Sequence, residues 1–131
     1  MPAGNPRARE TLDFALENPT EMANFYCAMA YPGSPLFQDA RREGYDLPKT
    51  YAGYSQHSYE TLNLRNRNLT SAEILSFRDY AWGAYHDSRN YITLMKSKFG
   101  EKAFNELDNT KKIKLKRKIL EGSKTEPSFS N

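Results

Sequence analysis

The sequence predicts an α/β fragment that is mostly α-helical, with a single strand among its helices. Three observations support this fold class. Helix caps and helically spaced apolar residues recur along most of the 131 residues, one short run (residues 22–30) has the composition of a buried strand, and we find no second strand candidate. Only 38% of the residues are hydrophobic, and nine tyrosines are present, so we expect a thin, aromatic core.

The elements before residue 45 have clear start and stop signals. An Asn-Pro pair predicts a helix from residue 5 to about residue 17. Residues 22–30, MANFYCAMA, are small or apolar on both faces, as in a parallel strand that is covered on each side. The Pro-Gly-Ser-Pro turn at 32–35 then predicts a helix that is capped by Ser34 and stops at Gly44.

The elements after residue 44 begin with a long loop. Residues 45–69 are rich in tyrosine and show no sustained helical period, and such a long irregular segment is usually functional. Thr70 and Glu73 form a capping box that predicts the start of a helix. We expect this helix either to continue or to be capped again near Asp87 and Ser88, and then to end at Phe99 and Gly100.

The predicted organisation has four parts. Residues 1–44 supply helix, strand and helix, and residues 45–69 the long loop. Residues 70–122 form a helical extension whose last helix is expected at 101–121, and residues 123–131 read as a disordered tail. A lone strand leaves its backbone N–H and C=O groups unpaired, which a buried environment does not tolerate. We therefore expect the chain to be incomplete.

Charge and cysteine content restrict the class of protein. Residues 1–60 carry five basic against eight acidic residues, whereas residues 61–131 carry fourteen against eight. No stretch has the length and hydrophobicity of a signal peptide or a membrane span. Cys27 is the only cysteine, so the chain has no disulfide framework and no cysteine-based metal site of its own. We expect a cytoplasmic protein without a membrane partner and without a metal site.

Few residues suggest catalysis. Cys27 as a nucleophile would need a base, and only His57 and His86 are available. Cysteine in an apolar run is more often buried and inert, which is the interpretation we favour. The loop at residues 53–64 concentrates polar and aromatic side chains that can line a pocket or merely cover a surface, namely Tyr54, Gln56, His57, Tyr59 and Glu60.

A basic segment near the C-terminus leaves two interpretations open. Six of the eight residues from Lys111 to Lys118 are Lys or Arg. Clusters of this kind bind phosphates, but Ile113, Ile119 and Leu120 indicate a core-facing stripe, so a solvated amphipathic helix face is favoured and nucleic acid is not the expected partner. The alternative is a stand-alone helical binding or accessory module that contacts nucleic acid through Lys114, Lys116 and Arg117.

Several phrases in order resemble one enzyme family. These are ANFYCAMAYPGSPLF, GY-LP, YAGYSQHSYET, LT-AEIL-FRDYA--AYH and Y---MK-KFG. Together they resemble the C-terminal part of radical SAM enzymes, and most closely the group with an N-terminal cobalamin-binding domain. The resemblance implies the last strand and helices of a partial (β/α) barrel followed by a helical C-terminal extension, with an upstream strand pairing with residues 22–30.

The resemblance also implies site residues. The backbone of Ala28, Met29 and Ala30 would lie near the adenine of S-adenosylmethionine, with Tyr31 shaping the mouth of the barrel. The loop that contains Gln56, His57 and Tyr59 would cover the side where a small-molecule substrate binds.

One departure from the family pattern bears on activity. The CxxxCxxC motif that holds a [4Fe–4S] cluster is absent, and a single cysteine cannot replace it. S-adenosylmethionine, the [4Fe–4S] cluster and possible cobalamin would therefore belong to a complete enzyme, and this chain alone would bind none of them. The implied partner is the N-terminal part of the barrel, in the same polypeptide or in a separate subunit, and the isolated chain is expected to be inactive.

Overall fold

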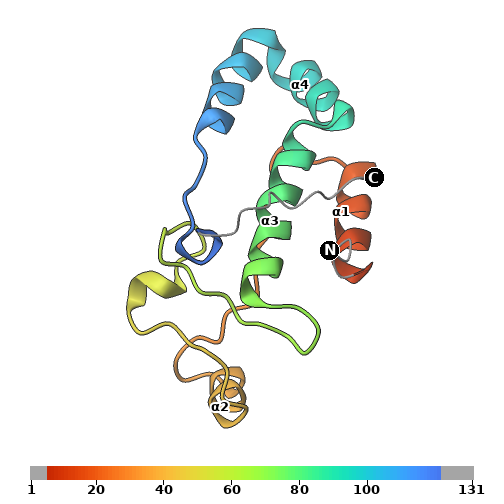
Figure 1. The fold of residues 1–131 in the computed structure, drawn as a ribbon. Coiled ribbons are helices and arrows are strands. Elements are labelled where there is room, and N and C mark those ends of the chain that lie inside the picture. Colours follow the sequence, from red (N-terminus) through yellow and green to blue (C-terminus); the bar gives the residue numbers. More distant parts are fainter. Residues whose placement is uncertain (1–5, 122–131) are drawn as a thin grey trace. The chain divides into compact units, whose positions relative to one another are not determined.

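The computed structural model describes residues 6–121 (Figure 1), and they are mostly helical, as predicted. No strand is present between residues 6 and 121. The four α-helices are α1 (Pro6–Glu17), α2 (Pro35–Arg42), α3 (Ser71–His86) and α4 (Arg89–Asp108). Three short 3-10 helices accompany them: η1 (Tyr51–Tyr54), η2 (Asn109–Lys112) and η3 (Lys118–Leu120).

The described residues divide into two compact units. Residues 6–25 and 79–114 make up unit 1, and residues 26–78 and 115–121 make up unit 2. Helix α3 contributes to both, since the division falls within it. Each unit is described below by itself.

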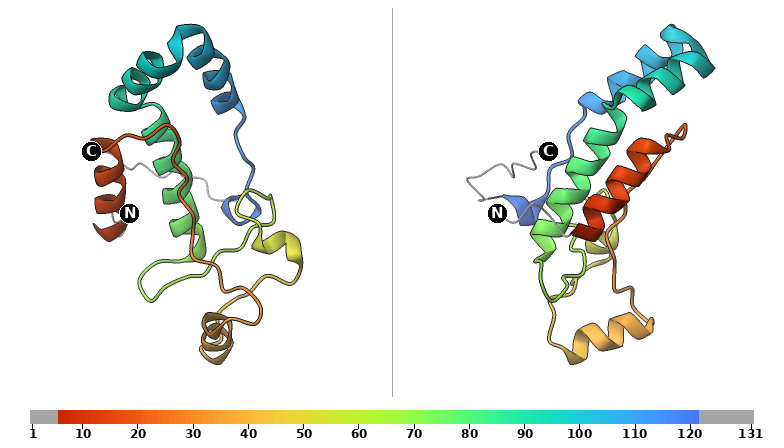
Figure 2. Two further views of the ribbon diagram at one scale, coloured as in Figure 1. Left: turned by 180° about the vertical axis from the view of Figure 1, so that it is seen from behind. Right: turned by 90° about the vertical axis from the view of Figure 1, so that its right-hand side faces the viewer.

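The prediction of a strand at residues 22–30 is wrong, because this segment is irregular (Figure 2). A strand needs a neighbouring strand to pair with its backbone, and residues 6–121 supply none. A side chain provides part of that pairing instead. The amide oxygen of Gln56 accepts from the Cys27 N–H at 3.1 Å, and its amide nitrogen donates to the Cys27 carbonyl at 2.9 Å. The Leu64 N–H donates to the Ala28 carbonyl at 2.9 Å.

The turn and caps around α2 form as predicted. The Ser34 hydroxyl accepts from the Phe37 N–H at 3.1 Å, which satisfies one of the free donors of the first helical turn. At the other end Gly44 has φ +72°, a conformation that glycine adopts without strain. The Tyr45 N–H then donates to the Ala40 carbonyl at 2.9 Å, which closes the helix in a Schellman arrangement.

The caps of α3 and α4 also agree with prediction. The Thr70 hydroxyl accepts from the Glu73 N–H at 3.2 Å, and the Ser88 hydroxyl accepts from the Tyr91 N–H at 3.2 Å. Gly100 interrupts α4 with φ +83° and ψ +163°, a region that is essentially restricted to glycine. The predicted break at Gly100 is therefore confirmed, and the second half of α4 takes a new direction after it (Figure 1).

The predicted final helix at 101–121 is wrong beyond Asp108. Residues 109–112 form η2, and the chain then continues without α-helix. Six like charges within eight residues repel one another along a helix, and Arg117 turns inward to 3% exposure to bind loop carbonyls. The expected core-facing stripe is wrong at Ile113, which is 74% exposed.

Unit 1 is held by contacts of α1 and its following residues with α3 and α4. Leu12 of α1 and Tyr85 of α3 are each 1% exposed. The Tyr85 hydroxyl accepts from the Thr20 N–H at 2.7 Å and donates to the Thr20 carbonyl at 2.7 Å. The Asn90 side chain of α4 donates to the Leu16 carbonyl at 2.9 Å. These bonds attach α1 to both later helices.

Two predictions fall partly or wholly outside the described residues. These are the cap at residue 5 and the disordered tail at 123–131. Within residues 6–121, no helix combines the length and the apolar character needed to cross a membrane.

Candidate functional site

Two sets of residues that the resemblance singled out separately lie together in unit 2. We call residues 26–31 the clamped segment and residues 53–64 the tyrosine loop. Besides the Gln56 bonds to Cys27, two ring contacts join them. The Tyr26 and His57 rings meet edge to face with centroids 6.2 Å apart, and the Tyr31 and Tyr54 rings lie 5.9 Å apart. The tyrosine loop therefore lies against the clamped segment along its length.

The C-terminal residues of unit 2 fix the tyrosine loop. The Arg117 guanidinium donates from Nη1 to the carbonyls of Gln56 at 2.7 Å and Ser58 at 3.1 Å. The Lys118 N–H donates to the Tyr59 carbonyl at 2.8 Å. The Tyr59 hydroxyl donates to Glu121 at 2.5 Å, and this hydrogen bond raises the pKa of Tyr59. Arg117 thus holds in place the residue whose side chain binds Cys27.

The backbone of Met29 and Ala30 is the least satisfied part of the clamped segment. These residues are 7% and 3% exposed, yet no hydrogen bond from any residue between 6 and 121 reaches their N–H or C=O groups. The Tyr31 carbonyl, in contrast, accepts from both the N–H and the hydroxyl of Ser34, at 3.1 and 2.7 Å. More than nine in ten buried backbone groups are paired in native proteins, so Met29 and Ala30 are exceptional.

His57, Tyr31 and Cys27 differ in their access to solvent. The His57 ring is exposed, with Nε2 3.5 Å from Nη2 of the buried Arg78. Tyr31 is 50% exposed. Cys27 is 6% exposed, and reactive cysteines are typically more accessible, so its burial is typical of an inert thiol.

Two buried polar side chains of the tyrosine loop were not singled out from the sequence. Thr61 and Asn63 are 0% exposed, and neither the Thr61 hydroxyl nor the Asn63 amide atoms find a hydrogen-bond partner among the described residues. Their backbone groups are partly engaged, since the Asn63 carbonyl accepts from the Ser71 hydroxyl at 2.7 Å and the Thr61 N–H donates to the Ser58 carbonyl at 3.4 Å. Nothing in the sequence distinguishes a buried Asn in such a loop from a solvated one, so burial alone reveals this feature.

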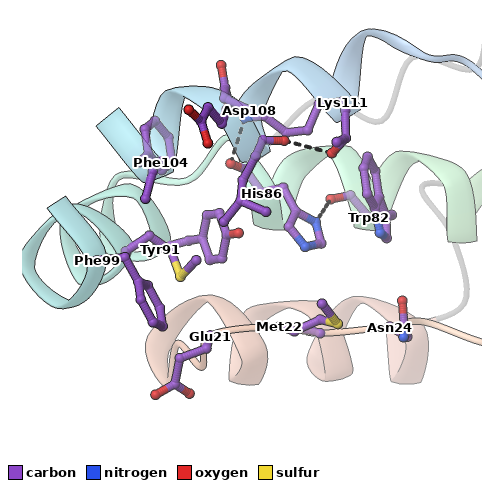
Figure 3. Close-up of a pocket in the computed structure, with 16 residues that line it drawn as sticks. Glu21, Met22, Asn24, Trp82, His86, Tyr91, Phe99, Phe104, Asp108 and Lys111 are labelled. Carbon is purple, nitrogen blue, oxygen red and sulfur yellow. Dashed lines mark hydrogen bonds and ion pairs between the residues drawn. The ribbon is translucent and has the colours of Figure 1, made fainter. Parts of the chain in front are cut away.

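Unit 1 contains a separate pocket of about 600 Å³ that the sequence did not predict (Figure 3). It lies between residues 21–24, the end of α3 and both halves of α4, whose direction changes at Gly100. His86 from α3 stacks on Trp82 with ring centroids 4.4 Å apart, and its Nδ1 lies 2.7 Å from the Trp82 carbonyl. Lys111 donates to the His86 carbonyl at 3.0 Å and forms ion pairs with Asp87 and Asp108.

The basic segment at 111–118 is used partly within the protein. Lys111 lines the pocket just described, Arg117 binds the tyrosine loop, and Lys112 donates to the Asn109 side chain at 3.0 Å, so three of the six basic side chains bind other residues of the chain. The alternative of a basic last helix is wrong in its structural part, since residues 113–117 are not helical.

Comparisons with known proteins found no matching family model, no matching curated protein and no matching solved structure. The residues present do not fit a [4Fe–4S] cluster, which is held by several cysteine thiolates, because Cys27 is the only cysteine of the 131 residues. Within residues 6–121, no group of three or more His, Cys, Asp and Glu side chains is placed to hold a metal ion.

Proposed function

We propose that this chain is the C-terminal part of a radical SAM enzyme, to which it contributes the barrel end near the adenine of S-adenosylmethionine and one side of the substrate site. The observation that carries the proposal is the buried and unpaired backbone of Met29 and Ala30. Such groups need a partner from elsewhere, and the resemblance names two, an upstream barrel strand and the adenine.

The surroundings of these groups support this assignment. The Cys27 N–H and C=O are bound by Gln56 and the Ala28 carbonyl by Leu64, so the unpaired groups of Met29 and Ala30 follow the last backbone group that the tyrosine loop binds. In an extended segment, backbone groups of successive residues point to opposite sides. Met29 and Ala30 would then offer one donor–acceptor pair to a neighbouring strand and the other to a ligand.

The candidate residues take different roles in the proposal. Gln56 is a positioning residue, because both polar atoms of its amide are occupied by Cys27. Tyr59 is likewise committed to Glu121. His57 keeps an exposed ring and is the residue of the tyrosine loop best able to touch a substrate, while the exposed ring of Tyr31 can flank the adenine.

The chemistry of the enzyme would come from the rest of the assembly. A [4Fe–4S] cluster, when bound there, supplies the electron that cleaves S-adenosylmethionine. The residues of this chain would bind and orient the cofactor and shield the site from water, and the chain would have no activity by itself.

The first test is the size of the native polypeptide in its source cells, measured by immunoblot with an antibody against this segment. We expect either a band much larger than 15.1 kDa, or a 15.1 kDa band that co-purifies with a protein carrying CxxxCxxC. A 15.1 kDa chain that purifies without such a partner would contradict the proposal.

A second test addresses the adenine contact in that native assembly. We expect Tyr31→Ala to weaken S-adenosylmethionine binding about tenfold by calorimetry, since base–aromatic stacking contributes roughly 1–3 kcal/mol per base. Tyr51→Ala is the matched control, because Tyr51 is 91% exposed and lies outside the clamped segment. Equal affinities for the two variants would refute the placement of Tyr31.

A further inference from the structure

We propose that the pocket of unit 1 binds an apolar organic cation, such as a quaternary ammonium or a hydrophobic amine. This inference rests only on unit 1 and is independent of the proposed enzyme function. Its starting point is Gly100, whose left-handed φ changes the direction of α4, so that residues from both halves of the helix line one pocket. At about 600 Å³, the pocket has the size typical of small-molecule sites.

Aromatic and methionine side chains form much of the pocket wall. The aromatic side chains that line it are Trp82, Tyr91, Phe99 and Phe104, and the methionines are Met22 and Met95. Aromatic faces attract cations through the negative potential above the ring, and tryptophan is the strongest of them. The chain already uses this chemistry here, since the Lys96 ammonium lies 5.4 Å from the centroid of the Phe104 ring.

The pocket also remains open to solvent at an apolar edge. Met22 is 75% exposed, Phe99 51% and Leu107 47%, and all three line the pocket. Figure 3 shows Glu21 and Met22 on the irregular stretch of chain that faces α3 and α4 across the opening. A ligand that entered here would cover large apolar side chains that residues 6–121 leave in water.

The charges around the pocket select the sign of the ligand. Three carboxylates line it, those of Glu21, Glu106 and Asp108, against one ammonium, that of Lys111. The ion-pair partners of these groups are Lys98 for Glu21 and Asp87 for Lys111, and the Lys96 ammonium over Phe104 is paired with Glu101. Five carboxylates therefore lie in or beside the pocket, against three ammonium groups.

Glu106 is the carboxylate that remains available. It is exposed, and its carboxylate forms no hydrogen bond or ion pair with any residue from 6 to 121. The Lys111 ammonium, in contrast, is already paired with Asp87 and Asp108. Partial burial lowers its pKa, but hydrogen bonds to Asp108 and Asp87 outweigh that effect, so the pKa is raised and the ammonium persists. The excess negative charge is therefore not neutralised from within the pocket, and an anionic ligand would be repelled.

Trp82 provides a direct assay, because it is the only tryptophan of the 131-residue chain and it lines the pocket. Its fluorescence is followed during titration with phenyltrimethylammonium, with its neutral isostere tert-butylbenzene and with the anion benzenesulfonate. We expect a saturable change with the cation, with a Kd about three- to tenfold lower than that of the neutral isostere, as cation–π attraction predicts. Benzenesulfonate is expected to bind more weakly than either.

A charge-removing variant and a matched control complete the test. Glu106→Gln is expected to raise the Kd of the cation about two- to fourfold at low salt, and to leave that of tert-butylbenzene unchanged. Glu10→Gln in α1 makes the same charge change away from the pocket lining and is expected to have no effect. The proposal is overturned if tert-butylbenzene or benzenesulfonate binds as tightly as the cation, or if the cation gives no saturable change up to tens of millimolar.

Discussion

Replacement of Gln56 tests the main contact of the candidate site. In Gln56→Leu, the Cys27 N–H and C=O lose both side-chain hydrogen bonds, which measure 3.1 and 2.9 Å. Each such bond contributes about 1 kcal/mol net, and leaving a buried polar group unsatisfied costs roughly 1–3 kcal/mol. Because Cys27 is 6% exposed, water cannot readily replace the lost partner. We expect Gln56→Leu to lower the free energy of unfolding by about 2–4 kcal/mol.

The isosteric variant Gln56→Glu keeps the shape of the side chain and changes only its hydrogen-bonding groups. Its carboxylate can still accept from the Cys27 N–H, but it faces the Cys27 carbonyl with a second negative oxygen. The ionised form is therefore disfavoured in the folded state, which raises the pKa of the new Glu above its unfolded value of about 4.3. A raised folded pKa means that stability is gained at low pH and lost as pH rises through that pKa. We expect the deficit of Gln56→Glu to shrink as pH falls below about 5.

The assay is urea unfolding followed by far-ultraviolet circular dichroism, together with hydrogen exchange of the Cys27 and Leu64 amides. Both amides lie in the contact between the clamped segment and the tyrosine loop, and both should exchange faster in Gln56→Leu. Gln38→Leu and Gln38→Glu are the controls, since Gln38 is exposed on α2, and they are expected to change stability by less than about 0.5 kcal/mol. A Gln56→Leu variant as stable as Gln38→Leu, with unchanged exchange, would refute the reasoning.

Three further predictions concern unit 1. Gly100→Ala should lower the free energy of unfolding by about 1–3 kcal/mol because Gly100 has a φ of +83°, whereas Gly83→Ala inside α3 should raise it by about 0.5–1 kcal/mol. Thermal unfolding distinguishes the two variants, and equal shifts of their unfolding temperatures would contradict the prediction. Tyr85→Phe removes both bonds to Thr20 and should cost about 1–2 kcal/mol in urea unfolding, so unchanged stability would show that these bonds are unimportant. The pKa of Lys111 in the folded protein is raised above 10.5, so the stability that Lys111 contributes is present below pH 10.5 and is lost as pH rises above it. The difference in the free energy of unfolding between wild type and Lys111→Met should therefore narrow as pH rises past 10.5. A difference that stays constant with pH would contradict this prediction.

The helix boundaries could be predicted where a local cap determines them. Ser34, Thr70 and Ser88 each bind an N–H three residues further on, and Gly44 and Gly100 each adopt a positive φ. These features depend only on a few neighbouring residues, which explains why the sequence reveals them.

The two wrong predictions, the strand at residues 22–30 and the last helix, depend on interactions with residues that are distant in the sequence. Residues 22–30 have the composition of a strand, but a strand also requires a second one, and Gln56 binds this segment instead. The basic segment has helical spacing, but Arg117 is drawn into carbonyl contacts 59 and 61 residues away. Local propensity could not reveal either competing interaction.

The candidate sites were predictable to different degrees. Tyr31, Gln56 and His57 were singled out before the structure was known, but the role of Gln56 as a clamp depends on long-range geometry. The pocket of unit 1 was missed. Tyr91 and Met95 have the spacing of core residues, and the break at Gly100 was visible, but the direction in which the second half of α4 returns follows from the backbone angles at Gly100 rather than from any residue type.

The most direct test of the central claim is a measurement of 5′-deoxyadenosine. The native assembly is captured from its source cells under anaerobic conditions with an antibody against this chain, reduced, and incubated with S-adenosylmethionine. We predict that 5′-deoxyadenosine forms, and that the 131-residue chain alone forms none because its single cysteine cannot hold the cluster. The claim would be contradicted by a captured assembly that contains the chain together with its native partners, yet takes up no iron–sulfur cluster on reconstitution and releases no 5′-deoxyadenosine.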